Sequence, residues 1–198
     1  MRRTAGLLSR RAAARKALPP LLFFTDPVRT PDPEAVARTL PAGSAIVFRA
    51  FGAPDAEARG RRLLAVAKTR RLKLLVGADP ALAARIGADG VHLPERLVHR
   101  ARALRTAHPG WLVTAAAHSL SAARRAHACG AHAAVVSVAF SSNSASAGRP
   151  LGPIRMAQLA RAAGGRIYAL GGINNKTARR LKDAGLVGLA AVEGLAEP

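Results

Sequence analysis

Three kinds of residue pattern that mark common protein classes are scarce or missing in this sequence. It has a single cysteine, Cys129, which cannot form an intramolecular disulfide, so a reducing cytoplasm is the expected location. No apolar run reaches the length of a transmembrane helix, so no membrane partner is expected. Aromatic residues make up 4% of the 198 residues, which predicts an aliphatic core and alanine-rich helices. A single cytoplasmic domain with its own core fits these features.

Acidic residues are also scarce, with 11 Asp and Glu against 31 Lys and Arg, a formal net charge of +20. This balance is compatible with a nucleic-acid partner, an anionic substrate, or a general excess of arginine. Nucleic-acid-binding proteins usually interleave aromatics with basic residues or cluster the basic residues in one segment. Here arginine pairs are spread over separate elements, for example Arg61–Arg62, Arg124–Arg125 and Arg179–Arg180. We therefore expect solvated helix faces and no specific nucleic-acid partner, with nonspecific attraction to polyanions.

The chain divides into a short basic segment and one domain. Residues 1–20 are rich in alanine and arginine and predict an N-terminal helix or arm, which Pro19–Pro20 end. The apolar run at residues 6–8 is too short for a secretory signal. Residues 21–198 form the predicted domain.

Within that domain, apolar runs of strand length alternate with helical segments. Eight strands are predicted at Leu21–Thr25, Ala45–Arg49, Leu72–Val76, Gly90–Leu93, Trp111–Ala116, Ala133–Val138, Ile167–Leu170 and Leu189–Val192. Seven helices are predicted at Pro33–Leu40, Pro54–Thr69, Pro80–Ile86, Glu95–Ala107, Leu120–Cys129, Pro153–Ala163 and from Asn174 to about Ala184. This alternation is typical of an α/β protein with parallel strands, and eight repeats favour a (β/α)₈ TIM barrel over a doubly wound open sheet. The last outer helix is missing from the pattern, and either the N-terminal segment or a partner subunit in a homodimer would cover the gap.

A glycine pair, Gly171–Gly172, follows the seventh predicted strand and precedes a helix. Such a turn brings backbone N–H groups close to a ligand, and a helix start favours an anion. In barrels of this kind, phosphate often lies on the loops after strands seven and eight. The alternative is a tight turn between strand and helix that binds nothing.

Three segments carry a likeness to a known family: GADGVHLPE (Gly87–Glu95), AAAHSLSAARRAHACGAHAAVVSVAF (Ala115–Phe140) and YALGGINNKTARRLKDAGLVGLAAVEGL (Tyr168–Leu195). In order and spacing they resemble the thiamine phosphate synthase and TenI superfamily. The resemblance covers nearly the whole predicted barrel. It implies a (β/α)₈ fold, a thiazole phosphate ligand and a role in thiamine biosynthesis.

The residues that a synthase needs are mostly absent. Synthases join a pyrimidine pyrophosphate to a thiazole phosphate with Mg²⁺ held by carboxylates, because the departing pyrophosphate must be neutralised. By resemblance, Val47 and Phe51 stand at a glutamine and a lysine position, and Gly77–Ala78 stand where an Asn–Asp pair is expected; Arg49 is retained. In the loop after strand six, Arg149 is the only cation. We therefore expect no cofactor and no metal site.

The TenI group resembles this chain more closely. Its members isomerise a thiazole carboxylate phosphate, and His118 matches their histidine in the run His118–Leu120. A tautomerisation needs a group that accepts and returns a proton near neutral pH, which is typical of histidine. The alternative is that His118 is a partly buried histidine without a catalytic role. His92, in strand four, is interpreted as a core histidine.

The hypothesis has one catalytic residue and a set of ligand-binding residues. His118 is the acid/base. The substrate- and phosphate-binding residues are Arg49, Ser137, Arg149, Gly171, Gly172, Val192 and Glu193. Glu193 is unusual there, because a carboxylate repels a phosphate. Two alternatives remain open: an Mg²⁺-dependent synthase with relocated ligands at Asp26, Asp79 or Glu95, and a barrel that binds a thiamine precursor without catalysis.

Overall fold

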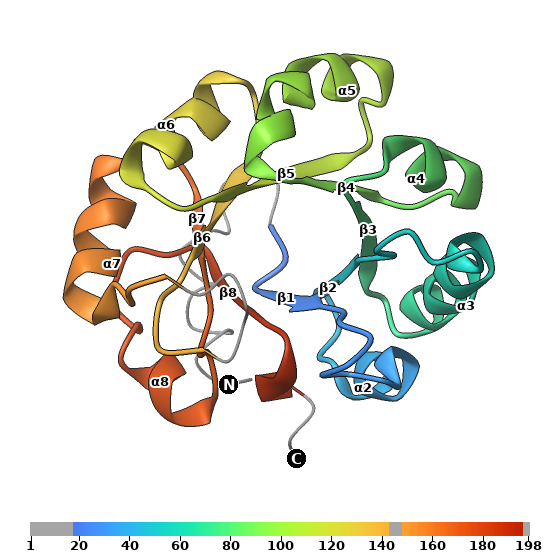
Figure 1. Cartoon of the computed structure of the whole chain (residues 1–198), viewed down its shortest axis with the longest axis horizontal. Helices are drawn as coiled ribbons and strands as arrows, with labels where there is room; N and C mark the ends of the chain where they lie inside the picture. The colour runs from blue at the N-terminus through green and yellow to red at the C-terminus, as the bar shows by residue number, and fades with distance from the viewer. Residues whose placement is uncertain (1–17, 143–147, 196–198) are drawn as a thin grey trace.

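The computed structural model describes residues 18–142 and 148–195, and these form a closed barrel of parallel strands (Figure 1). The strands lie side by side in sequence order, and β8 pairs with β1 through Leu21 and Leu189. Their bounds are β1 (Leu21–Phe24), β2 (Ala45–Phe48), β3 (Lys73–Gly77), β4 (Gly90–Leu93), β5 (Leu112–Ala117), β6 (Ala133–Ser137), β7 (Ile167–Leu170) and β8 (Gly188–Ala191). This closure confirms the predicted (β/α)₈ barrel and rules out the open sheet.

Helices surround the barrel as an outer ring (Figure 1). They are α2 (Pro33–Thr39), α3 (Ala56–Thr69), α4 (Pro80–Ile86), α5 (Ala101–Ala107), α6 (Leu120–Ala128), α7 (Gly152–Ala162) and α8 (Asn175–Arg179). Several begin at a residue whose side chain accepts a hydrogen bond from the first turn, as Asp32, Asp79, Ser119 and Asn174 do. After β8, the described residues contain only the 3₁₀-helix η2 (Glu193–Leu195), so no outer helix follows β8 within them.

Two predicted helices differ in the structure. The helix predicted over Glu95–Ala107 begins as a 3₁₀-helix, η1 (Glu95–Arg100), and becomes α-helical only at α5. The helix predicted to reach Ala184 ends at Arg179, after which Arg180 and Leu181 donate to carbonyls three residues back. In both places the backbone takes the tighter i to i+3 hydrogen bond, a choice that periodicity does not reveal.

The core has two layers that follow the alternation of side chains along the strands. In β1, Leu22 and Phe24 point into the barrel, whereas Leu21 and Phe23 pack against the helices. The barrel interior is a dense mixture of large and small side chains, namely Leu18, Leu22, Phe24, Ala45, Val47, Leu75, Leu112, Ala133, Val135, Tyr168 and Ala190. Most buried side chains of both layers are aliphatic, as the composition predicts.

The N-terminal end of the barrel is closed by Tyr168 and the chain that enters β1. Tyr168 is fully buried, and its hydroxyl donates to the carbonyl of Pro19 at 2.6 Å. Burial raises the pKa of Tyr168, so it remains a hydrogen-bond donor. Leu18 is buried beside it. Of the predicted N-terminal segment, residues 1–17 lie outside the described residues. Among the helices of residues 18–142 and 148–195, none has the length and apolar character to cross a membrane.

Candidate active site at the C-terminal end of the barrel

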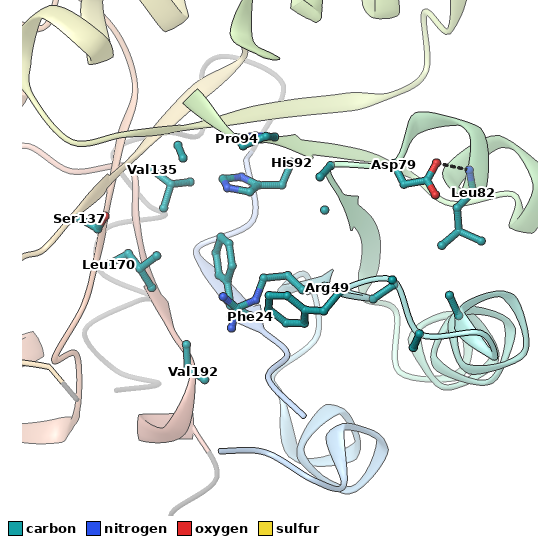
Figure 2. Close-up of a pocket in the computed structure, with 18 of the residues that line it drawn as sticks. Phe24, Arg49, Asp79, Leu82, His92, Pro94, Val135, Ser137, Leu170 and Val192 are labelled. Atoms are coloured by element: carbon teal, nitrogen blue, oxygen red, sulfur yellow. Dashed lines mark hydrogen bonds between the residues drawn. The ribbon is translucent and has the colours of Figure 1, made fainter. Parts of the chain in front are cut away.

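A cavity of about 720 Å³ lies over the C-terminal ends of the strands (Figure 2). Each strand, or the loop directly after it, contributes to the wall; the contributing residues include Phe24, Arg49, Gly77, His92, Ala116, Ser137, Leu170 and Val192. The volume falls in the range of cavities that enclose small molecules, and the position is the one at which barrel proteins bind ligands. The cavity is therefore the candidate active site.

His118 and Ser137 form a hydrogen-bonded pair in this wall. His118 Nδ1 lies 3.0 Å from Ser137 Oγ, and the two residues come from the ends of neighbouring strands, β5 and β6. The backbone N–H of His118 donates to Glu95 Oε2 at 3.1 Å, and Glu95 is itself held by Arg125 at 2.7 Å. The main chain and the imidazole are thus both fixed, with one ring nitrogen engaged by a hydroxyl.

His92 is a second histidine of the cavity, and its environment is different. Its Nδ1 lies 3.0 Å from Thr114 Oγ1, and its ring meets that of Phe24 edge-on at 4.9 Å between centroids. Burial, with a smaller contribution from the Arg49 charge, lowers the pKa of His92 to about 3. His92 is therefore neutral near neutral pH and suits ligand hydrogen bonding rather than proton transfer. The interpretation of His92 as a core histidine agrees with its burial, but the residue also lines the cavity.

A chain of charged side chains joins the loops after β1, β2 and β8. Asp26 Oδ2 lies 3.2 Å from Arg49 Nη2 and 3.1 Å from Arg29 Nη2, and Arg29 Nε lies 3.7 Å from Glu193 Oε1. Burial alone would raise the pKa of Asp26, but hydrogen bonds from Arg29 and Val28 outweigh it, so the pKa lies below its ordinary value. The carboxylate is therefore charged and committed to the two arginines.

Arg49 lines the cavity, but other residues of the chain already hold its guanidinium. Its Nε donates to the carbonyl of Thr25 at 2.7 Å, and its terminal carbon lies 5.0 Å from the centre of the Phe51 ring. Burial lowers the pKa of Arg49, and the Asp26 charge opposes this. Any ligand carboxylate would have to share Arg49 with Asp26.

A smaller polar cavity of about 210 Å³ adjoins the first, and Gly171, Val192 and Arg29 line both. Gly172 and Glu193 line only the smaller one. It lies between the loops after β6, β7 and β8, which is the predicted position for phosphate.

The glycine pair in this region is required by packing. Gly171 and Gly172 have φ angles of +99° and +61°, a region that disfavours other residues. A Cβ at Gly172 would lie 2.3 Å from the carbonyl oxygen of Ser141. The tight-turn interpretation therefore accounts for the pair without a ligand.

The start of α8 does not offer the donors that the sequence suggested. The N–H groups of Lys176 and Thr177 both donate to Asn174 Oδ1, and the N–H of Asn174 donates to Thr177 Oγ1. This capping box satisfies the first turn internally. An anion in the smaller cavity would have to be bound mainly by other groups.

The structure brings most of the predicted site residues together. His118, Ser137 and Arg49 line the larger cavity, and the four residues from the loops after β7 and β8 line the smaller one or both. Arg149 is exposed and lines neither cavity. Arg29 and Thr114 were not predicted. The pair Asp26 and Arg29, three residues apart after a strand, was the only sequence signal for Arg29.

The carboxylates that the sequence offers for Mg²⁺ have other partners in the structure. Asp26 is bound by two arginines, Asp79 Oδ1 accepts from Leu82 N at 2.8 Å to cap α4, and Glu95 is held by Arg125. Across the described ranges, no three His, Cys, Asp or Glu side chains are grouped so that they could hold a metal ion. At the positions that resemble synthase ligand positions, Val47 is buried inside the barrel and Phe51 is 64% exposed at the rim.

The fold and cavity define a (β/α)₈ barrel with a small-molecule site, and comparison with known proteins gives the family. The family model described as thiamine monophosphate synthase (TMP-TENI) matches residues 21–195. A thiamine-phosphate synthase of Anaeromyxobacter dehalogenans is 35% identical over 175 residues, 84% of this chain and 78% of that protein. A thiamine-phosphate synthase of Methylococcus capsulatus is 35% identical over 161 residues, 77% of this chain and 70% of that protein. The chain belongs to the thiamine phosphate synthase/TenI superfamily of thiamine biosynthesis, which confirms the resemblance.

Solved structures agree with this fold. The thiamine phosphate pyrophosphorylase from Pyrococcus furiosus aligns with a TM-score of 0.75 at 23% identity, covering 88% of this chain and 85% of its own. FabK from Thermotoga maritima aligns with a TM-score of 0.69 at 16% identity, and the alignment covers 98% of this chain and 62% of FabK. At these identities the likeness shows the barrel fold and not the reaction.

Proposed function

We propose that this protein is a TenI-like isomerase that binds a thiazole phosphate and converts a thiazole carboxylate phosphate to its aromatic tautomer. The observation that carries the proposal is the His118–Ser137 pair, in which a histidine on the cavity wall is oriented by a hydroxyl at 3.0 Å. A second support is that the nearby carboxylates are engaged by arginines or by a helix cap.

In this proposal, His118 moves a proton, and no oxidation or reduction takes place. With Nδ1 donating to Ser137 Oγ, Nε2 carries the lone pair that takes the proton from the substrate ring. The same nitrogen, now protonated, returns the proton to the exocyclic carbon at the far end of the conjugated double bonds, so that these shift into the ring and the ring becomes aromatic. Histidine suits both halves of the step because it is readily protonated and deprotonated near neutral pH.

The two cavities divide the ligand between them. The apolar wall around Phe24, Val135 and Leu170 would contact the thiazole ring, and neutral His92 would accept or donate a hydrogen bond there. The phosphate would occupy the smaller polar cavity beside Gly172. Arg49 would attract the substrate carboxylate from the rim.

The test is turnover of the thiazole carboxylate phosphate by purified protein in the presence of EDTA. We expect wild-type turnover to survive EDTA and His118→Asn to lower kcat by roughly 10² to 10⁴, while thiazole phosphate still binds. His99→Asn is the matched control, since His99 is exposed on η1 outside both cavities. Wild-type turnover retained in His118→Asn would contradict the proposal.

A second candidate is the Mg²⁺-dependent synthase, which the names of the 35% identical relatives favour. It would require Asp26, Asp79 or Glu95 to leave their present partners. Thiamine phosphate and pyrophosphate formed only with Mg²⁺ and the pyrimidine pyrophosphate would support it. Ligand-induced stabilisation without turnover in either assay would instead indicate a binding barrel without catalysis.

A further inference from the structure

We propose that Arg29 is the anion-binding residue of the smaller cavity and that Glu193 lies against its Nε nitrogen until a phosphate group displaces it. This inference rests on the proposed function, because it concerns how the phosphate end of that ligand is held. It makes Glu193 a specificity-determining residue and gives a role to an arginine that the family resemblance did not indicate.

Arg29 is fixed in position by Asp26. Its Nη2 lies 3.1 Å from Asp26 Oδ2, and its backbone N–H donates to Asp26 Oδ1 at 3.0 Å. Its side chain is 19% exposed, and the residue lines both cavities. The guanidinium is thus held at the boundary between them through its Nη2 nitrogen.

The Nε nitrogen of Arg29 meets Glu193 much more loosely. Arg29 Nε lies 3.7 Å from Glu193 Oε1, longer than a hydrogen bond, and the Glu193 side chain is 47% exposed. A half-exposed pair of this kind contributes little to stability. The Glu193 carboxylate can therefore leave Arg29 at small cost, whereas Asp26 cannot.

The charges around the smaller cavity explain why displacement is needed. Among the described residues that line it, Arg29 is the only cation and Glu193 the only anion, so these residues together carry no net charge. A phosphate that entered beside Glu193 would meet a like charge at close range. A phosphate that replaced Glu193 would instead present several oxygens to a preplaced guanidinium, which is a stronger, charge-assisted contact.

The test compares the affinities of hydroxyethylthiazole phosphate and of the unphosphorylated hydroxyethylthiazole alcohol, measured by calorimetry at constant ionic strength. We expect Glu193→Gln to tighten the phosphate compound about tenfold through lost repulsion and to leave the alcohol unchanged. Arg29→Gln should weaken binding of the phosphate compound by about tenfold or more. The affinity of Arg29→Lys should lie between those of the wild type and Arg29→Gln.

Asp183→Asn is the charge control, because Asp183 is exposed in the turn before β8 and lines neither cavity. It changes net charge as Glu193→Gln does and should leave both affinities unchanged. Melting temperatures establish that each variant is folded, and Glu193→Ala replaces Glu193→Gln if the latter is not.

The outcomes separate the two proposals. If the wild type binds the phosphate compound and Glu193→Gln binds it equally or more weakly, the inference that phosphate displaces Glu193 is wrong. The proposed function is not affected by that result. If Glu193→Gln and Asp183→Asn tighten binding alike, the effect is one of net charge and the inference is overturned. If no variant binds the phosphate compound at all, both proposals fail together.

Discussion

His118 and Ser137 face each other across the ends of β5 and β6, with Nδ1 of the histidine 3.0 Å from the serine hydroxyl. The proposed mechanism gives this bond the task of orienting the ring. Ser137→Ala should therefore lower kcat about tenfold while KM stays nearly constant, because the proton-transfer step loses its geometry but the ligand keeps its contacts.

The control for this variant is Ser121→Ala, since Ser121 is an exposed serine of α6 that bonds Ser119 and lines neither cavity. Steady-state kinetics on both variants provide the measurement. An unchanged kcat in Ser137→Ala would mean that the hydroxyl does not position His118.

His92 makes the stability of the barrel depend on pH. The folded protein keeps His92 neutral down to about pH 3, whereas the unfolded chain protonates it near its ordinary pKa of 6.5. Between these values the unfolded state binds more protons, so the free energy of unfolding falls as pH falls. His127, whose pKa burial also lowers, acts in the same direction. The His92 contribution approaches about 1.4 kcal/mol per pH unit below its unfolded pKa.

Urea denaturation at pH 7, 6 and 5 measures this dependence. His92→Gln should flatten the pH dependence while lowering stability at pH 7, because Thr114 loses its partner. The depressed pKa of Asp26 affects stability only at lower pH, since both its folded and ordinary values lie below this window. The same slope in wild type and His92→Gln would show that His92 is not the titrating group.

Gly172→Ala should destabilise the fold more than Gly185→Ala. Both glycines have positive φ angles, +61° and +74°, so alanine carries a conformational cost of about 1 kcal/mol at either position. Only at Gly172 would the new Cβ meet the backbone, 2.3 Å from Ser141 O; at Gly185 nothing lies within 4 Å. We expect an additional loss of about 1–3 kcal/mol at Gly172. Equal melting temperatures for the two variants would contradict this packing argument.

Tyr168→Phe tests the closure at the opposite end of the barrel. Removing the hydroxyl leaves the buried Pro19 carbonyl without its donor, which should cost about 1–3 kcal/mol of unfolding free energy. Because Tyr168 lies at the N-terminal end, away from both cavities, ligand affinity should not change. A change in affinity without a loss of stability would be the opposite of this expectation.

The strands and most helices were predictable because their signals are local. Short apolar runs such as Leu21–Phe24 and caps such as Asp79 act within a few residues of sequence. The cavity-lining position of His118 also followed, since strand ends meet at one end of a barrel.

The contacts that define the site's chemistry were not predictable in this way. The Arg29–Glu193 pair joins residues from opposite ends of the domain, and it exists only because β8 closes on β1. His92 is buried where β4 pairs with β5, opposite Thr114, and this burial lowers its pKa. Arg149 was selected as the only cation of the loop after β6, yet it lies outside both cavities.

The most direct measurement is turnover of the thiazole carboxylate phosphate in EDTA by the wild type and by His118→Asn, with ligand binding followed in parallel. Our account predicts turnover in the wild type, its loss in His118→Asn, and thiazole phosphate binding in both. Thiamine phosphate formation that depends on Mg²⁺, with no tautomer turnover in EDTA, would contradict it.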